Sequence, residues 1–167
     1  DSQMVYLSAS QGTKSGGFFT GLATSDAQLK PYDPETLYAY EIGLKGRMVD
    51  YGLTYEASVF YYDYQDVQTY ITDSSGAVPV NRLSNIDGAT IYGLDLTASW
   101  NPSFLPDLTL RTGVGLLDSE LESFESSGGV VPKGNKQPDA PDFSFSLQTR
   151  YDFDVSDDIT GNFSVDG

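Results

Sequence analysis

Between Tyr92 and Trp100 every second residue is apolar, and the residues in between are small or polar. Alternation with a period of two predicts a β-strand with one apolar face and one polar face. The apolar face begins and ends with an aromatic side chain. These two aromatic residues are about 26 Å apart along a strand that rises about 3.3 Å per residue. A chain built from such strands must place each apolar face against something other than water.

The same alternation recurs along the chain and predicts seven strands. They are Met4 to Ser10, Pro34 to Gly46, Tyr51 to about Ile71, Tyr92 to Trp100, Leu108 to Leu117, Phe143 to Tyr151, and Ile159 to Val165. The connections between them alternate between long and short. The long ones, rich in glycine, serine and other loop-forming residues, are Gln11 to Asp33, Asp73 to Gly88 and Asp118 to Pro141. This order predicts an all-β, antiparallel up-and-down meander with its long loops at one end.

The expected height of the strands and the order of long and short loops favour the interpretation that this chain is part of a transmembrane β-barrel. Tilted by about 40°, the strand from Tyr92 to Trp100 would span about 20 Å, close to the lipid-facing band of a bacterial outer-membrane barrel. Such barrels have short periplasmic turns and longer outer loops, so the first strand is expected to run outward. Aromatic residues fall near two levels, as expected of anchors at the membrane interfaces. They are Tyr40, Tyr61, Tyr92 and Phe143 near the outer rim, and Tyr55, Trp100 and Tyr151 near the inner rim.

Composition excludes several other classes of function. The chain contains no Cys and no His, which excludes disulfides, thiolate zinc sites and a histidine general base. Its net charge of −15 disfavours nucleic-acid binding, because phosphate contacts need clustered Lys and Arg. A soluble antiparallel sandwich also has alternating strands, but it does not need aromatic residues at both ends of its apolar face.

Several short motifs follow one another in a set order through residues 1 to 100. They are Tyr6 to Phe18 with its Lys14-Ser15-Gly16-Gly17-Phe18 end, Tyr32 to Leu37 followed by Tyr40 to Lys45, Ser58 to Gln68, Asn85, and Ile91 to Asp95. Together they resemble the barrel domain of TonB-dependent outer-membrane receptors, in which a Gly-Phe-Lys-Ser-Gly-Gly-Phe-like loop precedes Pro-Glu-x-x-x-x-Tyr-Glu-x-Gly-x-Lys and Phe-Tyr-x-x-Tyr-x-Asp-x-Gln strands. Thr13 stands where the family often has a hydrophobic residue.

The resemblance implies a 22-stranded barrel with a plug domain inside it, located in the bacterial outer membrane. Such receptors take up scarce ligands, most often ferric siderophores, with energy from the TonB complex. The chain is then expected to be an interior piece of the barrel of about seven strands, without the plug, the TonB-contacting N-terminal region or the last strands. Expected partners are the TonB complex, a small ligand and the lipid bilayer; no cofactor and no enzymatic activity are expected. A soluble all-β ligand- or carbohydrate-binding module and a passive porin are the alternatives.

Acidic residues suggest two further hypotheses. The predicted lumen-facing acids are Glu41, Glu56 and Asp95, which could line a ligand path or contact a plug, although a wet interior is polar in any case. They lie on different strands with no implied cleft, which disfavours a carboxylate pair for glycoside hydrolysis. The loop acids Asp118, Glu120, Glu122 and Glu125 could bind Ca²⁺, but they lack the ligand spacing of a calcium loop. A solvated acidic loop without bound metal is favoured.

Candidate ligand contacts lie in the predicted outer loops, because loops carry binding residues more often than strands do. Stacking or charge makes four residues candidates: Lys14, Phe18, Phe19 and Arg82. Loop packing would account for the same residues.

Overall fold

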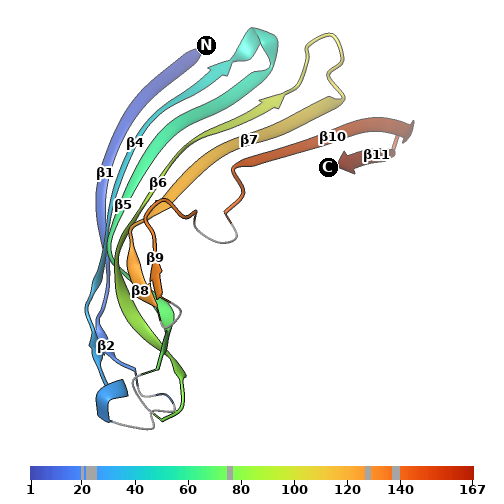
Figure 1. The fold of residues 1–167 in the computed structure, drawn as a ribbon. Helices are drawn as coiled ribbons and strands as arrows, with labels where there is room; N and C mark the ends of the chain where they lie inside the picture. The colour runs from blue at the N-terminus through green and yellow to red at the C-terminus, as the bar shows by residue number, and fades with distance from the viewer. Residues whose placement is uncertain (20, 22–25, 75–76, 127–128, 137–139) are drawn as a thin grey trace.

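The computed structural model describes residues 1–19, 21, 26–74, 77–126, 129–136 and 140–167. One antiparallel sheet contains seven long strands in the order β1-β4-β5-β6-β7-β10-β11 (Figure 1). Their bounds are β1 Ser2–Lys14, β4 Glu35–Met48, β5 Leu53–Asp73, β6 Val80–Trp100, β7 Leu108–Leu121, β10 Phe143–Ser156 and β11 Ile159–Asp166. Each long strand pairs with the next one along the chain, which confirms the predicted meander. Within the described ranges the sheet stays open, with β1 and β11 as its edges.

Short elements occupy the connections. Two small hairpin pairs lie at one end of the sheet, formed by β2 (Gly17–Phe18) with β3 (Pro31–Tyr32) and by β8 (Phe124–Ser126) with β9 (Gly129–Val131). Two 3₁₀ helices complete the fold, η1 (Asp26–Gln28) and η2 (Val49–Tyr51). In the part of the chain that the structure describes, no helix has the length and apolar character needed to cross a membrane.

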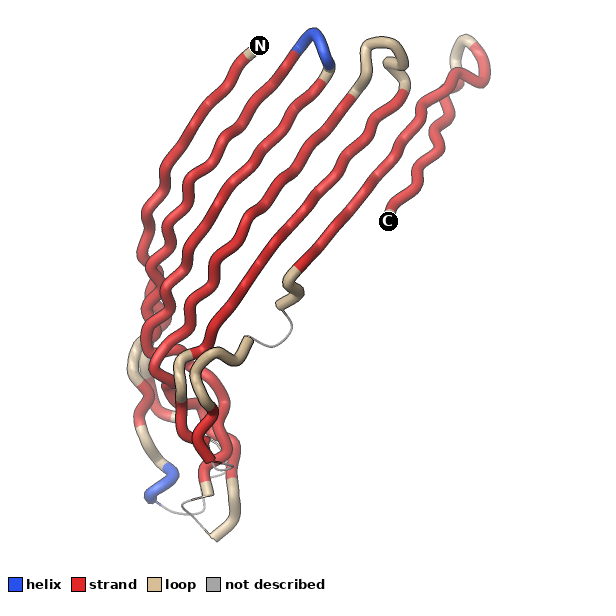
Figure 2. Tube along the Cα trace, turned by 45° about the horizontal axis from the view of Figure 1, so that its top comes forward, coloured by secondary structure: helices blue, strands red, loops and turns tan. Residues whose placement is uncertain are grey.

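The strand register places apolar residues directly opposite one another. One row crosses six strands and consists of Val5, Leu44, Ala57, Leu96, Val114 and Phe145. Cross-strand pairs of this kind are the unit from which sheets gain their stability. The side chains of this apolar face are nevertheless exposed, for example Leu7 by 80% and Val59 by 52%, and Figure 2 shows the seven strands as a single layer. The apolar face is therefore not packed against another layer of the described chain.

Aromatic rings cover glycines on neighbouring strands. The directly opposed pairs are Tyr6 with Gly43, Tyr55 with Gly46, Phe60 with Gly93, and Phe153 with Gly161. At each of these glycines an added Cβ would lie under 3.0 Å from a ring atom of its partner. The ring thus shields backbone that the glycine leaves bare, which offsets the low strand propensity of glycine.

Short connections join the strands at the end we call the turn end. Gly52 ends η2 in the left-handed region, with φ of 63°, and its carbonyl accepts a hydrogen bond of 2.8 Å from the backbone N–H of Asn101. The indole N–H of Trp100 donates to the carbonyl of Tyr51 at 3.0 Å. The β4–β5 and β6–β7 turns therefore brace each other.

At the opposite, long-loop end, three predicted strand limits were wrong. The fourth long strand begins at Val80 rather than Tyr92 and pairs with β5 as far as Asp73, so most of the expected loop from Asp73 to Gly88 is strand. Likewise β1 continues to Lys14, and β7 continues to Leu121. In these extensions the two faces no longer differ in polarity, and period-two alternation cannot detect a strand without that difference.

The extension of β5 and β6 beyond their neighbours forms a hairpin arm, residues 66–73 and 80–88. It projects at the lower end of the molecule in Figure 1. The buried hydrophobic residues Ile86 and Ala89 lie at its base. Phe60, also buried, lies further along β5 opposite Gly93, and its ring stacks on Tyr62 with a centroid distance of 4.9 Å. Among the described residues, the few buried hydrophobic side chains therefore lie at the arm or on the polar face, and not on the apolar face.

Candidate functional site

The predicted interface aromatic residues lie at two levels of the apolar face. Tyr40, Tyr61 and Tyr92 stand directly opposite one another near the long-loop end, with Phe143 one row further in. Near the turn end are Trp100, Tyr151 and, one row further in, Tyr55. The two levels agree with the predicted arrangement, and the role of these residues as membrane anchors stays a prediction.

The three predicted lumen-facing acids share the polar face. Glu41, Glu56 and Asp95 line one hollow of about 460 Å³. The hydroxyl of Tyr6 donates a hydrogen bond to Glu41, and Nζ of Lys45 lies 2.6 Å from Oε1 of Glu56. Two of the three carboxylates therefore have partners within the wall itself. Contact of these acids with a ligand or plug stays a prediction.

Two lysines from the returning half of the predicted acidic loop, which begins on β7, pair with its carboxylates. Nζ of Lys133 lies 2.5 Å from Oε1 of Glu122 and 3.6 Å from Oε1 of Glu120. Lys136 lies 2.6 Å from Asp142, and these hydrogen-bonded carboxylates raise the pKa of both lysines. Among the described residues, no group of three or more acidic side chains is arranged to hold a metal ion. The side chain of Glu125, also predicted for this loop, lies outside the described set.

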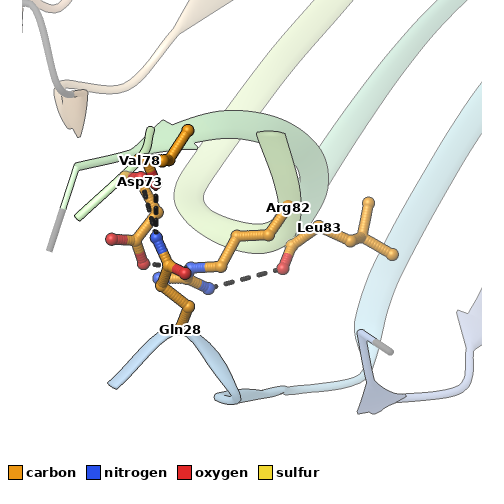
Figure 3. A network of polar contacts seen from close by, with 5 residues as sticks. All are labelled: Gln28, Asp73, Val78, Arg82 and Leu83. Carbon is orange, nitrogen blue, oxygen red and sulfur yellow. Dashed lines mark hydrogen bonds and ion pairs between the residues drawn. The ribbon is translucent and has the colours of Figure 1, made fainter. Parts of the chain in front are cut away.

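Arg82, predicted as a ligand contact, lies inside the hairpin arm. Its Nε is 2.6 Å from Oδ2 of Asp73, and both side chains are only 8% exposed. The amide of Gln28, from η1, donates to the carbonyl of Val78 at 3.0 Å and reaches the carbonyl of Asp73 at 3.5 Å (Figure 3). The burial of this ion pair favours a structural role for Arg82.

Two amide side chains fasten the base of the hairpin arm to the β1–β4 connection. Gln68 donates to the carbonyls of Ser15 and Asp33, both at 3.0 Å, and to that of Lys14 at 3.4 Å. Asn85 exchanges two hydrogen bonds with the backbone of Asp33, at 2.7 Å and 3.0 Å. Both residues belong to the sequence motifs noted above. Gln68 and Asn85 therefore have a structural role in holding the β1–β4 connection, and the sequence alone did not reveal this role.

We expect Gln68→Ala to loosen the β1–β4 connection without unfolding the sheet. The backbone carbonyls of Lys14 and Ser15 would lose this donor, while that of Asp33 would keep the one from Asn85. The free energy of local opening should therefore fall by roughly 1–3 kcal/mol. Hydrogen exchange in the full-length protein should accelerate in β2, β3 and residues 33–36. Gln65→Ala is the matched control, because among the described residues the side chain of Gln65 reaches only Asp63 of its own strand, at 3.3 Å. Equal exchange in the two variants would disprove this role of Gln68.

The other three predicted ligand contacts lie at the long-loop end. Lys14 is exposed and stands opposite Glu35. Phe18 is 71% exposed. The rings of Phe19 and Tyr70 form a T-shaped pair with a centroid distance of 6.0 Å, and Tyr70 is itself 67% exposed. Lys14 and Phe18 are therefore exposed at the surface, and Phe19 is half-buried, in contrast to the buried Arg82.

Comparison with known proteins agrees with this architecture. The family model described as "TonB dependent receptor-like, beta-barrel" matches residues 1–167. Pesticin receptors from Yersinia pestis and Yersinia enterocolitica are each 29% identical over 157 residues, covering 90% of this chain and 21% of the receptor. The chain thus spans about a fifth of the length of these curated relatives.

Two solved structures share the fold. The ferric yersiniabactin uptake receptor FyuA from Yersinia pestis superposes with a TM-score of 0.70 at 20% identity, covering 99% of this chain and 27% of that one. The siderophore receptor PiuA from Acinetobacter baumannii gives a TM-score of 0.62 at 21% identity, covering 89% of this chain and 22% of that one. At these identities the likeness concerns the fold alone.

Proposed function

The chain belongs to the TonB-dependent receptor β-barrel family, and from this premise we propose that it forms part of the barrel wall of a receptor for ferric siderophores. This is a family of bacterial outer-membrane transport receptors and not of enzymes. In the proposal, residues outside this chain complete the barrel, supply a plug and contact the TonB complex. The siderophore receptor PiuA and the ferric yersiniabactin uptake receptor FyuA share the fold of this chain, and they support the choice of ligand class.

The observation that carries the membrane part of the proposal is the exposed apolar face. A soluble sheet of this size would bury such a face, because large exposed apolar patches are rare on soluble proteins. Here the row from Val5 to Phe145 runs across six strands between two levels of aromatic residues. Lipid hydrocarbon satisfies this face, while the polar face would line the barrel interior. A soluble all-β binding module is therefore disfavoured.

In this orientation the long-loop end faces the outside of the cell, because outer-membrane barrels carry their longer loops there. We propose that Lys14, Phe18 and Phe19 belong to the surface that first meets the ligand. Aromatic rings can stack on an aromatic ligand, and an ammonium group can attract an anionic one. Membership of the receptor family favours active uptake over a passive porin.

Deletion of the full-length gene should abolish uptake of at least one ferric siderophore. Cells starved of iron would be given ⁵⁵Fe complexes of catecholate, hydroxamate and carboxylate siderophores, one at a time. We expect one complex to be lost in the deletion strain, restored by the wild-type gene, and lost again in a strain without TonB. Unchanged uptake of every complex would contradict the siderophore proposal. Uptake that continues without TonB would indicate a porin instead.

A further inference from the structure

The apolar face is hollowed near the turn end. The hollow has a volume of about 620 Å³, and its lining comes from the five neighbouring strands β4, β5, β6, β7 and β10. The strands β1 and β11 flank these five on either side, so strands from the rest of a barrel would not border the hollow. It is therefore complete within this chain. Most of its lining side chains are Leu53, Ala98, Trp100, Leu110, Thr112 and Leu147.

The order of small and large residues explains why the face is hollowed here. Ala98 and Thr112 stand directly opposite each other, and the same row continues to Tyr55 on one side and Leu147 on the other. The ring of Tyr55 lies over Gly46, where an added Cβ would be under 3.0 Å from it, and so it leans away from Ala98. Two small side chains thus form a floor between larger ones.

The polar groups of the lining are already used within the sheet. The hydroxyl of Thr112 donates a hydrogen bond to the carbonyl of Ser146 at 3.1 Å. The indole N–H of Trp100 donates to the carbonyl of Tyr51 at 3.0 Å, which also holds the indole in place as one wall. A polar occupant would lose its bonds to water without gaining bonds to these two groups. The lining therefore favours a hydrocarbon occupant.

We propose that this hollow holds an acyl chain of a phospholipid from the periplasmic leaflet. The inference rests on the proposed function, because that function turns the apolar face toward lipid and the turn end toward the periplasm. The hollow continues the lipid-facing surface. It also lies beside Trp100 and Tyr51, and aromatic residues of this kind mark the level at which acyl chains meet their headgroups.

The affinity of the hollow for an acyl chain should be modest. Lipid surrounds the whole face in a bilayer, so a chain that enters the hollow leaves no water behind. Its gain is the closer van der Waals packing against the floor and the walls. We therefore expect a preferred position for one acyl chain among the lipids around the barrel, and not tight binding.

The test uses the full-length receptor in vesicles of phosphatidylethanolamine and phosphatidylglycerol. A small share of the phosphatidylethanolamine carries a diazirine midway along one acyl chain, and mass spectrometry locates the adducts formed by light. Adducts at Leu53 and Leu147 should be about fivefold more frequent than at Val165, a ratio that corresponds to about 1 kcal/mol of packing energy. Val165 is an exposed residue of the same face, outside the hollow and in the row of Leu110.

Filling the hollow should remove this preference. Ala98→Phe places a ring over the floor, and the adducts at Leu53 and Leu147 should then fall about fivefold, to the frequency at Val165. Ala57→Phe is the matched control, because it makes the same change on the same face outside the hollow, and it should leave the adducts unchanged. Heat-modifiable mobility would verify that both variants are folded.

Three results would overturn the proposal. They are equal adduct frequencies at Leu147 and Val165 in the wild type, undiminished adducts at Leu147 in folded Ala98→Phe, and adducts missing from the hollow because a second receptor occupies it. Failure of the proposed function would look different, since a face that does not meet lipid would give no adducts at Val165 either. The two can therefore be told apart without measuring siderophore uptake.

Discussion

Replacing Arg82 with Ala should lower the stability of the hairpin arm by about 3–5 kcal/mol, the usual loss when a buried ion pair is left with one partner. The carboxylate of Asp73 would stay buried without its guanidinium, 2.6 Å away in the native arm. Limited proteolysis of the full-length receptor should then cut within residues 66–88. The rest of the sheet should resist cleavage, because the arm projects beyond the neighbouring strands.

Two further variants make this expectation specific. Lys133→Ala removes an ion pair with Glu122 that is 2.5 Å long but has side chains 57% and 40% exposed, so its effect should stay below about 1 kcal/mol. The double variant Asp73→Leu with Arg82→Leu should recover most of the lost stability, since apolar residues can replace a buried ion pair. If Arg82→Ala and Lys133→Ala were equally resistant to protease, the buried pair would not stabilise the arm.

Leu96→Arg should impair barrel assembly, with a loss of about 2–4 kcal/mol for an arginine near the bilayer midplane. Leu96 lies in the central row of the apolar face, between Ala57 and Val114. The measurement is the folded fraction of full-length receptor in the outer membrane, read from its heat-modifiable mobility on gels.

Thr97→Arg is the control from the next position in the chain. Thr97 lies on the polar face directly opposite Glu56, so an arginine there would meet water and a carboxylate. We expect near-normal assembly of this variant. Equal loss of folded receptor in the two variants would mean that the apolar face does not meet lipid, and the membrane part of the proposal would fail.

Alternation in the sequence was sufficient to predict the seven long strands and their two faces, because a sheet with one apolar and one polar side requires one polarity at every second residue. It also placed Glu41, Glu56 and Asp95 on one face and the seven aromatic residues at two levels. The same signal disappears beyond the apolar band. The predicted loop from Asp73 to Gly88 is largely strand, since a hairpin in water needs no difference between its faces.

Polar partnerships could not be predicted, because they join residues that are distant in sequence. Arg82 was a reasonable candidate for ligand contact in a loop, but its pairing with Asp73 depends on the hairpin register. Lys133 and Glu122 meet only because β8 and β9 fold the loop back on itself. The importance of Gln68 also needed coordinates, since its acceptors lie more than 30 residues away.

The strict separation of the two faces has a consequence for how the strands find their alignment. If β4 slipped by one residue against β5, every β4 side chain would turn to the opposite side. Glu41, Lys45 and Arg47 would then lie on the apolar side. In the proposed barrel this would cost a few kcal/mol for a basic residue near the bilayer midplane and less for one near the rim, such as Arg47. The surroundings of the proposed barrel would thus enforce correct pairing without an interlocking core. Substitutions on either side should be tolerated widely during evolution as long as polarity is kept.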